Sequence, residues 1–317
     1  MNAVPSGDRA REFTLAALVV AVVLAGPSVW AQPAAPTPEV HHIHGLAVDR
    51  RDPELLYVAT HTGLVRLRPG KTPEWVGTHR FDLMGFTANP RETGVVYASG
   101  HPDLVSYRKE GVGNLGLLLS RDGGQTWQSV SLRGEADFHA LTWSPRDGGQ
   151  LYGWSVAGQT GLYRISTGDW SRERLPGRGL SNVLALAASP DPAGPLLAGT
   201  RTGLFMSRDG GVGWAPVTAL PTDVAVTAVT YHSLDAKIVY AYLARSGLGL
   251  MRSRDGGGTW APRGLLVDPQ TPVVALAVGP GDQVVVATTS ADILRSRDGG
   301  RTWQPVLQRG RPPGPPR

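Results

Sequence analysis

Candidate metal ligands are concentrated in the first half of this 317-residue chain, where seven of its eight histidines lie before residue 140. Neutral imidazole is a good ligand for zinc, copper, nickel and iron, and a methionine thioether is a soft ligand that favours Cu⁺. The chain has no cysteine, so a thiolate site is excluded. The pattern therefore predicts a transition-metal site for copper or zinc. The predicted ligands are His42, His44, His61, Met84, His101 and His139.

Three carboxylates accompany these residues and leave two kinds of chemistry open. Asp82 or Asp137 could accept a hydrogen bond from an imidazole and so orient that imidazole toward a metal, whose bound water would then be a nucleophile. Alternatively, Asp82, Glu135 and Asp137 are the candidates for the paired acids of glycoside hydrolysis. The sequence does not decide between these roles, so no catalytic residue is assigned.

A short turn sequence recurs four times along the chain and predicts the elements that position these residues. In its first copy, the carboxylate of Asp122 can accept hydrogen bonds from the N–H groups of its own turn, and Gly124 supplies backbone angles that other residues resist. Trp127 then starts the next strand and buries a large ring. Each copy therefore predicts a β-hairpin with a pinned turn. The copies are LLLSRDGGQTW (117–127), LFMSRDGGVGW (204–214), LMRSRDGGGTW (250–260) and ILRSRDGGRTW (293–303).

This turn resembles the Asp box, or bacterial neuraminidase (BNR) repeat, of sialidases, sortilin-type receptors and the photosystem II assembly factor. The resemblance implies a β-propeller with the repeats as scaffold, and it is not specific to one activity. A sialidase-like hydrolase is one function that it suggests. However, the Arg-Ile-Pro signature of sialidases is absent, and YRIS at 163–166 falls in a third strand of its unit.

The repeat lies inside a longer unit of about 45 residues, which is the size of a four-stranded propeller blade. Six such units begin near residues 41, 82, 137, 181, 225 and 271, and 41 glycines and 26 prolines supply turns. We therefore predict an all-β fold with a single propeller of six four-stranded blades over residues 41–308.

Alignment of the six units places the candidate ligands at equivalent positions. His44, Met84 and His139 each stand six residues before the end of a first strand, whereas the last three units carry Leu184, Thr227 and Val274 there. His61 and His101 both stand at the end of a second strand. The start of an innermost strand and the end of its neighbour lie on the same face of a propeller. We therefore expect these side chains to meet at one mouth of the central channel, with the Asp boxes at the opposite face.

Strand alternation further predicts that His42 and His44 share one side of the first strand. A single histidine in a strand is often polar filling, and Met84 alone is often a core residue. Imidazoles that line a polar channel could also bind water or an anion. What favours a metal is the repetition of the histidines in adjacent blades.

The ends of the chain predict export. Arg9 and Arg11 precede the apolar run FTLAALVVAVVLAG, and small residues stand before Gln32. We expect a signal peptide at 1–31, a linker at 32–40 and a disordered Pro/Arg-rich tail at 309–317. The protein would then be periplasmic or secreted, with no integral membrane segment after cleavage. An uncleaved anchor is the alternative.

Three functions follow from these observations. The first is an exported binding protein that holds copper or zinc and serves metal handling or partner docking. The second is the glycoside hydrolase, and the third is a non-catalytic assembly scaffold. We expect a monomer with a periplasmic or membrane-protein partner. The net charge of +5 is scattered along the chain, so no nucleic-acid partner is expected.

Overall fold

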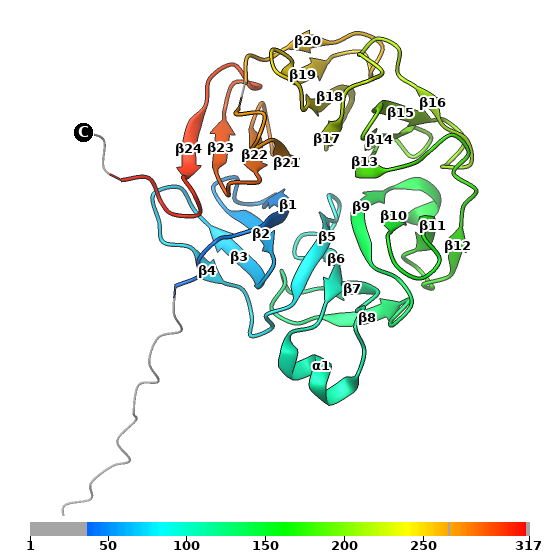
Figure 1. The fold of residues 1–317 in the computed structure, drawn as a ribbon, viewed down its shortest axis with the longest axis vertical. Helices are drawn as coiled ribbons and strands as arrows, with labels where there is room; N and C mark the ends of the chain where they lie inside the picture. Colours follow the sequence, from blue (N-terminus) through cyan, green and yellow to red (C-terminus); the bar gives the residue numbers. More distant parts are fainter. Residues whose placement is uncertain (1–36, 266, 315–317) are drawn as a thin grey trace, which may run out of the picture. The chain divides into compact units, whose positions relative to one another are not determined.

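The computed structural model describes residues 37–265 and 267–314. Within them, 24 strands form six four-stranded antiparallel sheets, each built from four consecutive strands. The sheets stand around a common centre as six blades, with the first strand of each blade innermost (Figure 1). The predicted six-bladed propeller is therefore confirmed.

The first three blades hold all the candidate ligands. Their strands are β1 (Ile43–Val48), β2 (Leu56–Thr60), β3 (Gly63–Leu67), β4 (Glu74–Trp75); β5 (Asp82–Ala88), β6 (Val96–His101), β7 (Leu117–Ser120), β8 (Gln128–Ser131); β9 (Phe138–Ser144), β10 (Gln150–Ser155), β11 (Gly161–Ser166) and β12 (Arg172–Arg174). A 3-10 turn, Arg146–Gly148, joins β9 to β10.

The last three blades complete the ring. Their strands are β13 (Val183–Ala188), β14 (Leu196–Thr200), β15 (Gly203–Ser207), β16 (Ala215–Pro216); β17 (Val226–His232), β18 (Asp235–Leu243), β19 (Gly249–Ser253), β20 (Ala261–Pro262); β21 (Val273–Val278), β22 (Val284–Thr288), β23 (Ile293–Ser296) and β24 (Gln304–Leu307).

One element was not predicted. Helix α1 (Leu104–Glu110) extends outward from blade two, between β6 and β7 (Figure 1). The Asp103 side chain accepts a hydrogen bond from the Ser106 N–H at its start, and Gly111 ends the helix in the left-handed conformation. Asp103 and Gly111 are ordinary cap signals, so the helix was readable from the sequence.

The core lies between the blades, and the inner strands show why. In β1, Leu46 packs toward blade six and Ala47 toward blade two. In β13, Leu186 packs toward blade three and Ala187 toward blade five. Successive side chains of a strand point to opposite faces, and the blades crowd together near the axis. Alternation of a large and a small residue therefore lets each inner strand pack against both neighbours.

The ring closes by packing rather than by a shared blade. Blades one and six bury one apolar cluster that includes Ile43, Leu56, Val285 and Ile293. The carboxylate of Glu54 also accepts hydrogen bonds from Arg295 Nη1 at 2.8 Å and Arg297 Nη2 at 2.6 Å. Because Glu54 is substantially exposed, these ion pairs add little, and the apolar cluster is the main closure.

The Asp boxes pin their turns as expected. In blade five, the backbone N–H and hydroxyl of Thr259 donate to the Asp255 carboxylate at 2.8 and 2.7 Å. These bonds lower the pKa of Asp255 to about 2. In the copy that lacks threonine, the Gly213 N–H contacts both carboxylate oxygens of Asp209, so the turn survives the replacement.

The tryptophans directly precede the fourth strands, and three of them donate from Nε1 to a glycine carbonyl of their own box.

Ordered packing extends past both predicted boundaries of the propeller. Val40, assigned to the linker, is fully buried in the closure cluster. After β24, Arg309 N donates to Asp292 and Gly310 N to Ala291 O, so the first residues of the predicted tail turn back onto blade six. The predicted signal peptide and residues 315–317 lie outside the described residues. Among residues 37–265 and 267–314, no helix is long and apolar enough to span a membrane.

Candidate metal centre

The first group of candidate ligands joins blades one and two. His44 lies in β1, His61 directly follows β2, and Asp82 begins β5. The carboxylate of Asp82 lies between the two imidazoles, with Oδ1 3.5 Å from His44 Nε2 and Oδ2 3.2 Å from His61 Nδ1. One potential ligand atom from each residue lies within 4.8 Å of the others. We refer to His44, His61 and Asp82 as the first triad.

The second group repeats this arrangement between blades two and three. His101 ends β6, Asp137 precedes β9, and His139 is the second residue of β9. Asp137 Oδ2 lies 3.4 Å from His101 Nε2 and 2.8 Å from His139 Nε2. The Asp137 side chain is only 4% exposed. We refer to His101, Asp137 and His139 as the second triad.

The two triads adjoin along blade two. Asp82 and His101 face each other directly across the β5–β6 pair. Gly100, with φ at 142°, makes this approach possible, because a Cβ there would lie 1.8 Å from the Asp82 carbonyl oxygen. Met84 follows two residues after Asp82 and is half-buried. The triads form without it, and they bring four of the six predicted ligands together with two aspartates.

His42 reaches the site by a route that strand alternation does not describe. Strand alternation does not explain the position of His42, because β1 begins at Ile43 and His42 has a left-handed φ of 47°. A register shift between Ile43 and Gly45 further breaks the alternation. The His42 ring nevertheless lies 5.7 Å from the His61 ring, centroid to centroid. Exposed at the rim, His42 could supply an additional ligand.

The Asp boxes and the triads lie at opposite ends of the strands. In blade two, the Asp-box residue Gly123 donates its N–H to Gly94 O, in the loop that joins the end of β5 to the start of β6. The triads stand instead at the start of β5 and the end of β6. The repeats are therefore scaffold and take no part in the site.

Several polar atoms of the triads are buried without a hydrogen-bond partner. They are His44 Nε2, Asp82 Oδ1 and Asp137 Oδ1. Such an atom costs about 1–3 kcal/mol when it lacks a partner. His44 Nε2 and Asp82 Oδ1 face each other at 3.5 Å, which is too long for a good hydrogen bond but suitable for two ligands of one cation.

In the second triad, the orientation of His101 also leaves two acceptor atoms facing each other. Its Nδ1 lies 3.1 Å from Gly113 O, and a carbonyl can only accept, so Nδ1 carries the proton. In the neutral ring, Nε2 then presents a lone pair to Asp137 Oδ2 at 3.4 Å. Two acceptors at this distance need a proton or a cation between them. The Gly113 carbonyl, which sequence reasoning missed, thus orients His101 as a ligand.

Burial changes the protonation of the first triad. Desolvation, together with His61, His139 and His42, lowers the pKa of His44 to about 4, against a smaller opposing effect of Asp137. Desolvation also raises the pKa of Asp82, while His61 and His101 oppose that rise. His44 is therefore neutral at physiological pH, which is the state that binds a metal.

The folded, metal-free protein is expected to lose stability in mild acid. His44 has a pKa of 6.5 when unfolded and about 4 when folded, so between these values the unfolded state takes up the proton. The contribution of neutral His44 to the free energy of unfolding is present above pH 6.5 and is lost as the pH falls toward 4. At about pH 5 the loss is about 2 kcal/mol. The raised pKa of Asp82 has the opposite sign, because the folded state then takes up the proton before the unfolded state does.

Urea unfolding at about pH 7.5 and about pH 5 measures this effect. The His44→Gln variant is the comparison, since glutamine is polar but does not titrate, and its free energy of unfolding should fall less. Equal losses for the two proteins would contradict the assignment.

The three carboxylates proposed for hydrolysis lie in different environments. Asp82 and Asp137 each contact two imidazoles at the channel mouth. Glu135 is 63% exposed and its carboxylate lies 3.7 Å from Arg172 Nη2. Glu135 therefore belongs to the surface, and each of the two aspartates lies in a group that could hold a metal ion.

Comparison with protein families supports the repeat assignment. The model of the photosynthesis system II assembly factor YCF48 matches residues 162–316, just under half of the chain. The BNR/Asp-box repeat model matches residues 118–129. No curated protein is significantly similar to this chain.

Several solved structures share the fold at low identity. The GH74 enzyme of Niastella koreensis has a TM-score of 0.58 at 16% identity, covering 85% of this chain and 46% of its own. The GH74 xyloglucanase of Xanthomonas campestris has a TM-score of 0.53 at 19% identity, covering 86% and 46%. A structure of YCF48 bound to a D1 peptide has a TM-score of 0.49 at 17% identity, covering 85% and 83%. The chain spans about half the length of the GH74 structures, and at these identities the likeness shows the fold alone.

Proposed function

Since the chain is a BNR/Asp-box repeat β-propeller protein, we propose that it is an exported binding protein that holds a transition-metal ion, zinc or copper, at the mouth of its central channel. The proposal rests on one observation above all. His44 Nε2 and Asp82 Oδ1 are buried, face each other at 3.5 Å and have no hydrogen-bond partner. A cation between them would satisfy both atoms.

The donor set bears on which ion would bind. Each triad offers two imidazole nitrogens and one carboxylate oxygen. Zn²⁺ and Cu²⁺ accept this mixture of nitrogen and oxygen, whereas Cu⁺ prefers sulfur. Met84 is the one soft candidate and stands beside the triads. The set therefore favours a divalent ion over Cu⁺.

Partner docking is the second part of the proposal. On α1, the side chains of Leu104 and Val105 are 73% and 78% exposed, and Tyr107 and Val156 add further exposed apolar surface. Helix α1 begins three residues after His101 of the second triad, and Val156 N donates to Asp137 O at 2.9 Å. Similarity to an assembly-factor family agrees with a surface for a protein partner.

Glycoside hydrolysis has less support. Its case depends on likeness to GH74 enzymes at under 20% identity, and Asp82 and Asp137 are both engaged by histidines. A pair of acids for hydrolysis needs one carboxyl free to donate a proton and another free to attack or to activate water.

Metal content of the protein purified without chelator tests the proposal. We expect at least one zinc or copper ion per chain by elemental analysis, and a binding isotherm by calorimetry after metal removal. His44→Ala and His139→Ala should each reduce the uptake. His232→Ala is the matched control, because His232 ends β17 at the opposite face and contacts Gly281 O.

Two results would decide against this function. The first is a metal-free preparation that gives no heat with Zn²⁺, Cu²⁺ or Cu⁺. The second is equal uptake by His44→Ala, His139→Ala and the His232→Ala control. N-terminal sequencing of the same preparation from its native host tests export, with a mature start at Gln32 expected.

A further inference from the structure

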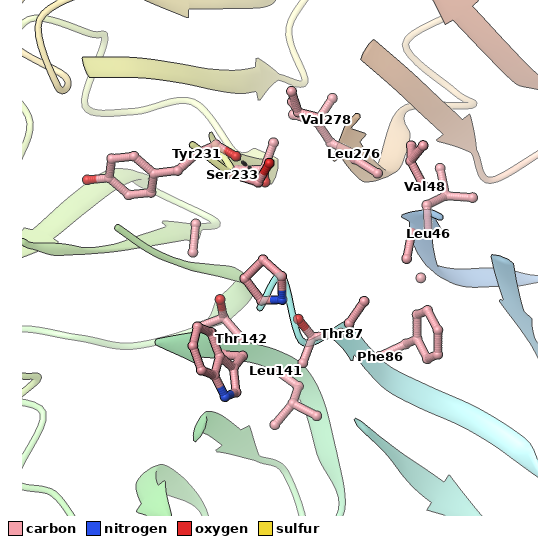
Figure 2. Close-up of a pocket in the computed structure, with 18 of the residues that line it drawn as sticks. Leu46, Val48, Phe86, Thr87, Leu141, Thr142, Tyr231, Ser233, Leu276 and Val278 are labelled. Atoms are coloured by element: carbon pink, nitrogen blue, oxygen red, sulfur yellow. Dashed lines mark hydrogen bonds between the residues drawn. The ribbon is translucent and has the colours of Figure 1, made fainter. Parts of the chain in front are cut away.

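A cavity of about 450 Å³ occupies the centre of the propeller and is lined by the inner strands of all six blades. Figure 2 shows several of the lining side chains around this space. Ligand sites commonly range from about 300 to 1,000 Å³. Each blade has a large apolar residue at the same level of its inner strand, and all of these except Leu276 are at most 9% exposed and pack mainly between blades. These residues are Leu46, Phe86, Leu141, Leu186, Val229 and Leu276.

Two of the threonine hydroxyls that line the cavity are already engaged with the protein backbone. Thr142 Oγ1 accepts a hydrogen bond from Ala188 N at 3.1 Å, and Thr230 Oγ1 donates to Tyr231 O at 3.2 Å. Val48, Leu276 and Val278 are only partly buried and add further apolar surface. At the level of Val48, Leu276 and Val278 the cavity therefore favours a hydrocarbon over a carbohydrate, whose hydroxyls would need hydrogen-bond partners.

The triads and the cavity meet at two residues. His44, from the first triad, and His139, from the second, both line the cavity. A metal held by three protein ligands keeps at least one coordination position for water or a ligand. A donor group that binds there would have the cavity beside it, so one molecule could use both features.

We propose that the metal-loaded channel binds a linear amphiphile, with a carboxylate head on the metal at the triads and an alkyl chain along the apolar cavity. This inference rests on the proposed metal-binding function and names the class of ligand that the same site would take. The carboxylate supplies the negative oxygen donor that a divalent cation prefers. The alkyl chain gains free energy by leaving water for the apolar lining.

A chain-length series tests the inference on the native protein. Straight-chain carboxylates from acetate to dodecanoate are titrated into the zinc-loaded full chain by calorimetry. We expect the dissociation constant to fall about fourfold for each added methylene until the cavity is full. The metal-free protein and alkylammonium ions of equal length should bind at least tenfold more weakly.

A variant separates the cavity from the metal. Val278→Phe narrows the cavity at a residue outside both triads, so it should leave zinc uptake unchanged and remove the gain from longer chains. Leu276→Phe is a second variant in case the first does not fold.

The possible failures are distinguishable. Zinc uptake with no dependence of affinity on chain length would overturn the amphiphile site and leave the metal site standing. Equal binding by the metal-free protein, or by the alkylammonium ions, would have the same meaning. Absence of metal uptake would overturn both proposals.

Discussion

Replacement of Asp137 by asparagine is expected to lower the metal affinity of the second triad by at least 100-fold, since even outer-shell partners of metal ligands are worth about 10- to 100-fold. Asp137 is 4% exposed and lies within 3.4 Å of both His101 and His139. Asparagine keeps the size of the side chain but removes its negative charge. That charge offsets the cost of taking a cation out of water into the buried site. The first triad, which has its own carboxylate, should retain its affinity.

Thermal unfolding with and without zinc measures this effect without an activity assay. Ligand that binds only the folded state stabilises it by about 2.7 kcal/mol at 100 times the dissociation constant. We therefore expect a smaller zinc-induced rise of Tm for Asp137→Asn than for the native protein, and none for the Asp82→Asn, Asp137→Asn double variant. An equal rise in all three proteins would show that zinc binds elsewhere.

Replacement of Gly100 by alanine is expected to destabilise the propeller and disturb the site together. Gly100 has a φ of 142°, and an added Cβ would lie 1.8 Å from the Asp82 carbonyl oxygen. Backbone strain at such a position costs about 1–3 kcal/mol and overpacking about 1–3 kcal/mol, for a total of about 2–6 kcal/mol. For a chain of this size, Tm should fall by roughly 10 °C. Because β5 must move away, Asp82 should also lose its place between His44 and His61.

Gly113→Ala is the matched control for this variant. A Cβ on Gly113 would meet no atom within 4 Å, and the carbonyl that holds His101 would remain. Its stability should stay within about 0.5 kcal/mol of the native value, as for most surface substitutions. If Gly100→Ala were as stable as Gly113→Ala, the close approach of β6 to Asp82 would not be needed for the fold.

Much of the architecture could be predicted because it depends on short-range interactions. The Asp255 carboxylate bonds to Thr259, four residues away, so the turn is contained in one stretch of sequence. Repetition of that turn within units of similar length then predicted the number of blades. Helix α1 depends equally on local interactions, through its caps Asp103 and Gly111, but a repeat of four strands does not predict a helix.

The candidate site could be predicted only in part, because repetition of the units gives the position of a residue along its strand but not its contacts. Equivalence of His44, Met84 and His139 across units placed them at one end of the inner strands. It did not say which side chains would touch. Strand alternation did not predict the orientation of His42, because an alternating sequence pattern does not reveal a left-handed residue or a register shift. Glu135, a candidate for the paired acids of hydrolysis, is exposed and lies beside Arg172 instead.

The sequence by itself determined the blades, their pinned turns and the end of the ring at which the histidines gather, because all of these follow from local hydrogen bonds and from repetition. Only the tertiary structure decided the two triads. His44 and Asp82 are 38 residues apart and belong to different blades, and they meet because the ring sets β1 beside β5. The same packing buries His44 and so keeps it neutral. The distance between His44 and Asp82 and the desolvation of His44 both result from packing between blades, so neither can be read from a single repeat.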